Sequence, residues 1–399
     1  MKKKLVQLTK TFIAIILLTS CNNQDTDKLV LSQEKKYVVK EALAKEIALK
    51  MLKEEGKNAV AEKELEVTSV KDVNHDPYFH IVNEKKGKSF VIVSGDKRLE
   101  PVLAFGDEKF DFENASEQLK FWMKGYANKI DFIRKDKEVV ASKEITSFNQ
   151  KVANIGAFTS SKLVSKQQRK ETEFVRQLTL TRWGQRCVYN SYAPTKEEVG
   201  CDTNASLPCG RAYTGCVATC LAQVVNYYKS MDAYDYTALN YEYTDADLGT
   251  KNGNEVGKLI KEVADIMDMK YTCNGSVSYS SDMLKKDVRE RLGFDEQLKS
   301  KRLNTMEIDE IYNELKEGNP MVISGKDYNN GRRVGHLWVV DGFLRYYAAK
   351  EENDQVYLHF NLGWSGSSNG WYLYNDFNLG SYNLNHYVTM YYNFRKNNN

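Results

Sequence analysis

Hydrophobic positions follow two different periods in the first part of the chain. Residues 36–75 open with apolar side chains three or four positions apart, which predicts an amphipathic helix. The apolar runs at 78–82 and 89–94 predict β-strands, and 110–135 again has the helical period. We therefore expect an α+β unit at residues 36–140.

A second unit follows a polar stretch. Residues 141–175 are rich in serine, lysine and glutamine, which is typical of an exposed linker. Residues 176–399 have helical periods first and strand-like apolar runs from Pro320 onward. This order predicts a helical lobe and a β-rich lobe with a cleft between them. Helices are expected near 254–267, 281–292 and 306–317, and strands at 321–324, 335–340, 356–361, 370–374 and 387–392.

The N-terminus has the pattern of an export signal. A basic start precedes the apolar run 12–18, which is too short to span a bilayer. Leu18-Thr-Ser-Cys21 follows and is similar to the bacterial lipobox. We expect residues 1–21 to be a lipoprotein signal peptide ending at a lipidated Cys21, with 22–35 as a tether. The alternative is an ordinary signal peptide with a chance cysteine.

Composition narrows the possible functions. The net charge is +3, and basic and acidic residues are interspersed, whereas a nucleic-acid binder would concentrate basic residues on one face. Cysteine and histidine do not occur at metal-ligand spacing, so we expect no metal and no cofactor. An exported chain can form disulfides among its six other cysteines, but the sequence does not fix their pairing.

Cys216 stands out among these cysteines. It follows Gly215 at the start of a predicted helix, where unpaired N–H groups and the helix dipole stabilise a thiolate. The glycine permits a tight turn and leaves room for a substrate. Cys220, one turn further on, is interpreted as a small buried residue. The remaining four cysteines, Cys187, Cys201, Cys209 and Cys273, lie in loop-like sequence.

A cysteine nucleophile needs a base, and histidine is the usual choice. Only five histidines occur, and three of them lie in the β-rich lobe: His336, His359 and His386. Gly335 leaves open access to the ring of His336. His359 shares a strand face with Asn361 by alternation. The local pattern alone leaves both His336 and His359 as candidates for the base.

Four motifs in order resemble those of the streptopain family of papain-like cysteine peptidases. TGCVAT at 214–219 is similar to the nucleophile motif, and GHLWVVDGF at 335–343 to the histidine motif. FNLGWSGSSNGWY at 360–372 is similar to the Asn/Trp segment, and WGQRCVYN at 183–190 to the glutamine segment. KSFVIVSGDKRLEPVLAFGDE at 88–108 is similar to the family's propeptide. The resemblance covers nearly the whole chain after the tether.

The resemblance implies a role for each motif residue. Cys216 is the nucleophile, and His336 is the base and later the acid, which decides against His359. Gln185 donates to the oxyanion together with the Cys216 N–H. Asn361 orients His336, and Trp364 shields their hydrogen bond from water. The implied fold is a papain-like domain, with a helical lobe and an antiparallel β lobe, behind an inhibitory α+β propeptide.

The resemblance also indicates residues that line the substrate cleft. Gly215 and Gly335 flank the catalytic pair. Gly275 and Ser276 lie in a segment similar to the family's cleft loop, which we expect to form a mobile wall with a broad, apolar preference. The chain departs from the family at Leu362, where an aromatic residue is common. This departure affects how side chains pack around His336, and hence which residue orients it.

The predicted function is an exported cysteine endopeptidase made as a latent zymogen, which acts through a thioester acyl-enzyme on protein or peptide substrates. The activation cut is expected in the basic stretch 160–171, and the lipid on Cys21 holds only the precursor at the cell envelope, in the outer membrane or periplasm. The mature enzyme is then released. Two other functions stay open: a catalytically silent binding protein or adhesin on the same scaffold, and a first unit that also inhibits other peptidases.

Overall fold

The computed structural model describes most of both expected units. The described residues are 36–54, 61–87, 89–135, 152, 172–202, 204–329, 332–347, 354–374, 378–379, 382–383 and 388–397. The expected signal peptide, the tether and the activation stretch 160–171 lie outside them, as does His386. Within the described part of the chain, no helix combines the length and the apolar character needed to cross a membrane.

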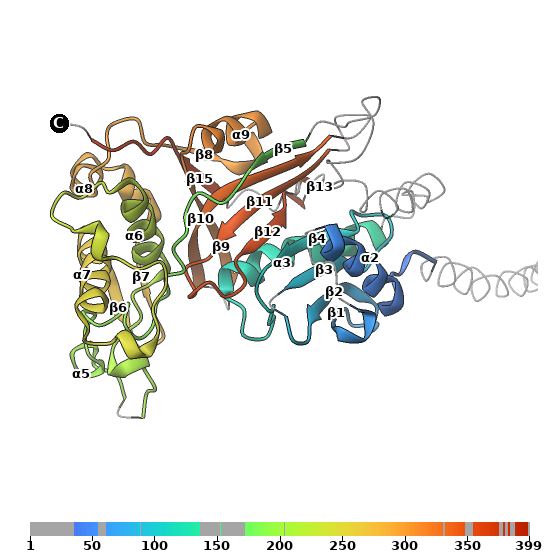
Figure 1. Cartoon of the computed structure of the whole chain (residues 1–399), viewed down its shortest axis with the longest axis horizontal. Coiled ribbons are helices and arrows are strands. Elements are labelled where there is room, and N and C mark those ends of the chain that lie inside the picture. Colours follow the sequence, from blue (N-terminus) through green and yellow to red (C-terminus); the bar gives the residue numbers. More distant parts are fainter. Residues whose placement is uncertain are drawn as a thin grey trace, which may run out of the picture.

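The first unit is an antiparallel sheet with two helices (Figure 1). Its elements are α2 (Glu41–Glu54), a 3₁₀ turn (Glu62–Glu64), β1 (Leu65–Lys71), β2 (Pro77–Glu84), β3 (Phe90–Ser94), β4 (Val102–Gly106) and α3 (Glu117–Lys135). Helix α2 buries the apolar positions that its period predicted, including Ile47 and Met51, in the same core as β2 and β3. The predicted α+β composition of this unit is therefore confirmed.

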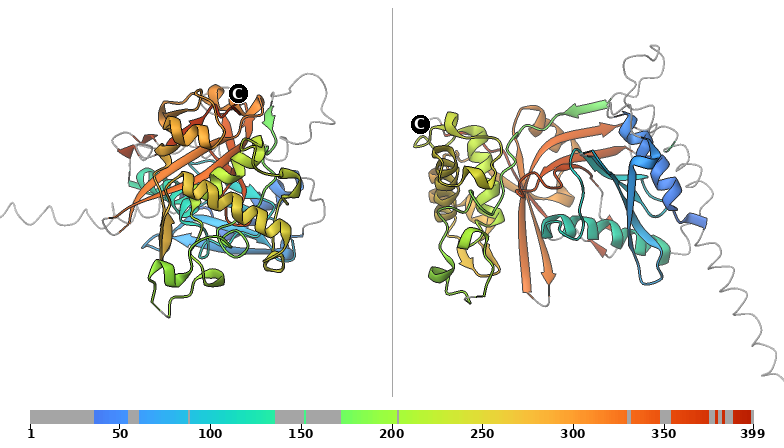
Figure 2. Two further views of the ribbon diagram at one scale, coloured as in Figure 1. Left: turned by 90° about the vertical axis from the view of Figure 1, so that its left-hand side faces the viewer. Right: turned by 60° about the horizontal axis from the view of Figure 1, so that its bottom comes forward.

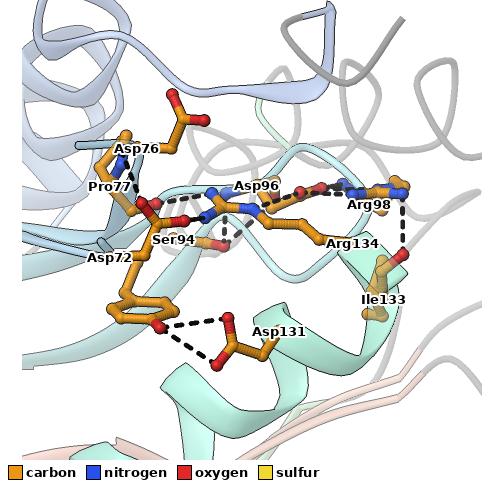
Figure 3. Close-up of polar contacts among 10 residues, drawn as sticks. Asp72, Asp76, Pro77, Ser94, Asp96, Arg98, Asp131, Ile133 and Arg134 are labelled. Atoms are coloured by element: carbon orange, nitrogen blue, oxygen red, sulfur yellow. Dashed lines mark hydrogen bonds and ion pairs between the residues drawn. The ribbon is translucent and has the colours of Figure 1, made fainter. Parts of the chain in front are cut away.

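A buried ion network fastens the end of α3 to the sheet of this unit (Figure 3). Arg98 forms a two-pronged pair with Asp96, with N···O distances of 2.8 and 2.7 Å, and also donates to the carbonyl of Ile133 in α3. Arg134, also in α3, donates to a carboxylate oxygen of Asp72 at 3.0 Å. Because Asp96 is 1% exposed, its charge is compensated inside the protein and not by water.

The helical lobe contains the central helix α6 (Cys216–Tyr228) and the amphipathic helix α7 (Lys251–Ile266), which pack together. Shorter elements surround them: α5 (Lys196–Val199), β6 (Lys270–Thr272), β7 (Gly275–Val277) and α8 (Lys286–Arg291), with 3₁₀ turns at Pro208–Gly210, Tyr236–Ala238, Asp245–Asp247 and Ser280–Leu284. Disulfides Cys187–Cys209 and Cys201–Cys273 hold its loops. Cys216 and Cys220 are the free cysteines of the described chain.

The β lobe is built from long antiparallel strands. Its elements are β8 (Lys299–Arg302), a 3₁₀ turn (Leu303–Thr305), α9 (Ile308–Lys316), β9 (Met321–Asn329), β10 (Arg332–Tyr346), β11 (Gln355–Asn361), β12 (Gly370–Leu373), β13 (Asn378–Leu379), β14 (Tyr382–Asn383) and β15 (Thr389–Tyr392). Strands β9, β10 and β11 are successive antiparallel neighbours in one sheet. Together with the helical lobe, this gives the predicted two-lobed domain.

One boundary differs from the sequence expectation. Residues 172–175, which we assigned to the linker, form strand β5 (Thr172–Val175), and β5 pairs with the end of β10 from Phe343 to Tyr346. Its exposed and half-buried residues alternate, because it lies on the edge of the sheet. The exposed positions are polar, and for this reason the sequence pattern predicted a linker here. The catalytic unit thus begins at or before Thr172.

The two units share a sheet. Strand β4 of the first unit pairs with β12 of the β lobe, which places both in one eleven-stranded sheet of the described chain. The β lobe therefore lies between the helical lobe and the first unit (Figure 1 and the right-hand view of Figure 2). Tyr126 of α3 reinforces the junction, because its hydroxyl bonds the carbonyls of Leu103 and Leu373 at 3.2 and 2.8 Å.

Candidate active site

The sequence expectation for Cys216 agrees with its place in the fold. It is the first residue of α6, and it is half-buried, while the positions that follow it are buried in the helical core. Gly215 caps the helix at φ 87° and ψ 148°. A Cβ at this glycine would lie 2.3 Å from the Met269 methyl group and 3.0 Å from the Ser276 carbonyl oxygen, so only glycine fits this close turn.

The pKa of the thiol shifts in the direction opposite to the one that the helix start favours. Burial raises the pKa of Cys216, although the backbone N–H groups of Leu337, Cys216 and Val217 act in the opposite direction. The helix start does favour the thiolate, as we expected, but desolvation outweighs it in this closed form. Cys220 is 1% exposed, and burial raises its pKa well above the usual range, in agreement with its interpretation as a core residue.

Strand β10, which carries His336, passes next to the thiol. The amide of Leu337 is one of the groups that act on the Cys216 sulfur, so the histidine's own strand borders the nucleophile. His336 itself is partly exposed and is paired in register with Gly325 of β9. A Cβ on the neighbouring Gly335 would meet no atom within 4 Å, so this side of the histidine is open, as expected.

Strand alternation places His336 on the face of β10 that the first unit covers. Trp338, two residues on, is fully buried, and its ring meets Trp122 of α3 edge to face, with centroids 6.4 Å apart. Leu337 and Val339, on the opposite face, belong to the core of the helical lobe that includes α6. The helix α3 therefore lies on the histidine's face of the sheet.

Gln185 reaches the site from the loop before α6. It is 6% exposed, and its side-chain N–H group points to the carbonyl of Gly363 at 3.5 Å. Its main-chain carbonyl accepts the N–H of Thr214, two residues before the nucleophile, at 3.2 Å. Gln185 thus joins the turn that leads to Cys216 to the loop that carries Trp364, and its role as an oxyanion donor stays a prediction.

Asn361 lies deeper than its expected role suggests. At the end of β11 it is 1% exposed, and its side-chain NH₂ group donates to the Thr181 carbonyl at 2.7 Å and to Gln223 Oε1 at 3.0 Å. The amide oxygen accepts from the N–H of Gly363 at 3.4 Å. Both N–H donors are committed to this network, so only the amide oxygen remains to serve His336, and the orienting role stays a prediction.

The loop after Asn361 brings the third motif to the cleft. Trp364 is half-buried and packs on the main core, and Leu362, the departure from the family pattern, is 1% exposed in the same core. The backbone is fixed to the glutamine segment because the N–H of Ser365 donates to the Trp183 carbonyl at 3.1 Å. The loop of Trp364 and the glutamine segment thus meet beside the turn that leads to Cys216, and the joint catalytic role of these residues with His336 stays a prediction.

The other expected cleft wall is a β-hairpin that lies against Gly215. Gly275 and Ser276 lie in the hairpin β6–β7, whose strands pair from Lys270 to Val277. The Ser276 hydroxyl donates to the Tyr213 carbonyl at 2.6 Å, and the Cys201–Cys273 disulfide fastens the tip. These two cross-links hold the hairpin against Gly215. The sequence did not show the disulfide pairing, and the mobility that the glycine and serine suggested stays a prediction.

His359, the rejected candidate base, has a buried partner that sequence reasoning missed. Its Nδ1 lies 2.6 Å from Asp341 Oδ1, and Asp341 is 0% exposed. The other carboxylate oxygen accepts from the backbone N–H of Thr179 at 3.0 Å and from the hydroxyl of the same residue. This pair braces the strands β10 and β11 and leaves His359 occupied away from the thiol.

Comparisons with known proteins agree with this site. Residues 183–372 match the model of the peptidase C10 family, and residues 36–130 match that of the Spi protease inhibitor. The matched segment 183–372 belongs to the streptopain-like peptidase C10 family. The inhibitor match coincides with the first unit, and the peptidase match spans every expected catalytic residue.

Among curated relatives, the chain is 26% identical over 344 residues to the thiol protease/hemagglutinin PrtT of Porphyromonas gingivalis. That alignment covers 76% of this chain but only 34% of the relative, so the chain spans about a third of its length. Streptopain of Streptococcus pyogenes is 24% identical over 320 residues, which cover 71% of this chain and 70% of streptopain. The structure of a prointerpain A fragment of Prevotella intermedia has a TM-score of 0.55 at 21% identity, with 82% of this chain and 98% of that one covered, and supports the fold.

Proposed function

We propose that this protein is an exported cysteine endopeptidase made as a latent zymogen, with Cys216 as its nucleophile and His336 as its acid and base. One observation carries the proposal: the half-buried thiol at the start of α6 is in reach of the amide of Leu337, the residue next to His336. A family match over the same segment supports it.

The proposed reaction uses this chain's own groups at each step. His336 takes the proton of Cys216, and the thiolate attacks the carbonyl carbon of the peptide bond. The negative charge on the carbonyl oxygen is stabilised by the N–H groups of Gln185 and Cys216. The C–N bond then breaks, His336 gives its proton to the leaving amine, and a thioester remains. Water, deprotonated by His336, attacks the thioester, and the C–S bond breaks to release the acid.

Latency follows from the contacts of the first unit. Helix α3 lies on the face of β10 that carries His336, and burial keeps the thiol protonated. In this proposal, cleavage of the linker lets α3 leave, so that the imidazole turns toward the sulfur and forms the reactive ion pair. Removal of the first unit is thus both the unblocking and the activating step.

The cellular location is a separate part of the proposal. Two disulfides in the helical lobe fit an oxidising compartment, as the export signal requires. With Cys21 lipidated, the anchor belongs to the first unit, and cleavage of the linker separates the catalytic unit from it. Cell fractionation with a high-salt wash tests this. The precursor should remain in the membrane fraction and the mature enzyme should lie outside it, and Cys21→Ala should remove the precursor from the membrane fraction. Mature enzyme retained after the wash would contradict it.

The activity itself is tested with three full-length chains. The wild type should process and cleave a peptide library, Cys216→Ala should fold but neither process nor cleave, and Cys220→Ala should behave as the wild type. An epoxide that inhibits papain-like enzymes should label Cys216. Residual activity in the purified Cys216→Ala chain would refute the nucleophile, and a folded wild type that never cleaves would favour the silent binding protein.

A further inference from the structure

A cation at the edge of the active site is held by a carboxylate of the first unit. Arg182 lies three residues before Gln185, and its guanidinium lies 2.5 Å from Oε1 of Glu108. On its other side, Nε is 3.2 Å from Oε2 of Glu242. The side chain of Arg182 is 37% exposed, that of Glu108 24% and that of Glu242 67%, so Glu108 is the more enclosed partner.

The backbone positions Arg182 firmly. Its N–H donates to the carbonyl of Tyr241 at 2.6 Å, and its carbonyl accepts the hydroxyl of Tyr189 at 3.3 Å. A Cβ at Gly366 would lie 2.3 Å from the Arg182 Nε, so the guanidinium lies directly against the loop that carries Trp364. Glycine at 366, with φ 77°, is what allows this approach.

These contacts place Arg182 on the same side of the site as the Trp364 loop. The β6–β7 hairpin contacts Gly215, next to the nucleophile, and the Trp364 loop contacts the side chain of Gln185. His336 must protonate the leaving amine, and Trp364 is the residue expected to shield it. We therefore assign the Trp364 side, and Arg182 with it, to the part of the substrate that leaves as the new amine.

There is room for a peptide next to this cation. Arg182 and Glu242 border a cavity of about 760 Å³ that continues along the second half of α6 to Lys229. Its walls include hydrogen-bonding side chains such as Asn226 and Tyr241. An extended polar peptide could thus continue past Arg182 without displacing core residues.

We propose, on the basis of the proposed function, that Arg182 recognises an acidic side chain in the leaving part of the substrate, and that Glu108 occupies this position in the zymogen. Glu108 belongs to the unit that activation removes, so one donor edge of the guanidinium becomes free in the mature enzyme. Arginine binds carboxylates through paired N–H donors, and the exposed Glu242, which lies near Nε alone, satisfies only part of that capacity.

The test uses mature enzyme and matched peptides that carry Glu or Gln at one of the first three positions after the scissile bond. At one of these positions the wild type should show a KM for the Glu peptide about five- to tenfold lower, as expected for one charge-assisted hydrogen bond, with similar kcat. Arg182→Gln should abolish this difference, because the KM for the Glu peptide rises to that for the Gln peptide. Glu242→Gln, which removes a competing carboxylate, should enlarge it.

Arg186→Gln is the matched control, because it removes an equal charge from an exposed arginine one residue after Gln185 that rests on the ring of Tyr213. It should keep the wild-type preference. Equal KM values for the Glu and Gln peptides in the wild type, or a preference that persists in Arg182→Gln, would overturn the proposal and leave Arg182 as a tether for the first unit. Absence of cleavage of the Gln peptides by the wild type would instead refute the proposed function.

Discussion

At the scale of single residues, the raised pKa of Cys216 makes a prediction about reactivity. In the unprocessed chain, with Cys220→Ala as background, the rate of alkylation by iodoacetamide should rise about tenfold per pH unit from pH 6 to 8. It should not level off below about 8.5, the usual pKa of a thiol, because burial shifts the pKa upward from there. After removal of the first unit, the pair with His336 should permit labelling near pH 6. A plateau below pH 7 in the unprocessed chain would contradict the buried, neutral thiol.

The two candidate histidines should differ in what they affect. In the mature enzyme, His336→Ala should lower kcat/KM by about 10³ or more, as the loss of a catalytic acid and base does. His359→Asn should lower it less than tenfold but reduce the melting temperature by several degrees, because Asp341 would lose its buried partner. Peptide kinetics and thermal unfolding of both variants measure this. The reverse ranking in kcat/KM would show that His359 is the base.

Residue roles were predictable from the sequence where a motif is local. Gly215 and Cys216 are neighbours at a helix start, so their arrangement follows from the chain itself. The Asp341–His359 pair was not predictable, because it depends on a register shift between Val340 and Gly342 where β10 pairs with β11. Contacts such as these need the strand register, which one sequence does not give.

At the scale of elements, α3 is the helix that connects the two units by its contacts. Its first half packs on the catalytic sheet through Trp122, and its last turn is fastened to the first unit through Arg134 and Arg98. Arg134→Ala leaves Asp72 and Asp96 short of a partner, so the first unit should lose roughly 3 kcal/mol of stability. Urea unfolding is monitored by tryptophan fluorescence in the full-length Cys216→Ala chain with and without Arg134→Ala. The chain with Arg134→Ala should begin to unfold at a lower urea concentration.

Lys109→Ala is the matched control, because its pair with Glu66 is about half exposed on both sides and should contribute less than about 1 kcal/mol. Equal urea midpoints for Arg134→Ala and the parent chain would show that the network of Figure 3 does not hold α3.

Hydrophobic periods predicted the elements that bury one clear face. Helices α7 and α9 and strand β11 lie within three residues of the expected ranges, whereas α3 begins seven residues later than expected and β10 extends six residues further. Strand β5 was missed because its exposed edge is polar, and hairpin β6–β7 because its three-residue strands are too short for a period to show. The pairing of β4 with β12 was also out of reach, because it joins residues more than 260 positions apart in the chain.

At the scale of the whole molecule, latency depends on the junction between the units. Two buried phenols cross it: the Tyr126 hydroxyl bonds Leu373 in β12, and the Tyr357 hydroxyl bonds the carbonyl of Val102 at 3.0 Å. Each belongs to one unit and bonds the backbone of the other, so removal of the hydroxyl leaves a buried carbonyl unsatisfied. Such a loss costs about 1–3 kcal/mol, and here it weakens the attachment of one unit to the other.

The corresponding prediction uses the same substitution at three sites. Tyr126→Phe and Tyr357→Phe should each raise the peptide hydrolysis of the unprocessed chain several-fold, because the free energy that holds α3 and β4 in place is reduced. Tyr372→Phe is the control: its hydroxyl is equally buried but bonds the Ser368 carbonyl at 2.6 Å within the β lobe, so it should affect stability and not latency. Initial rates are measured on chains whose linker is intact by mass spectrometry. If all three variants hydrolyse the peptide at the same rate, a general loss of stability explains the activity. The junction between the units would then not be what keeps the enzyme latent.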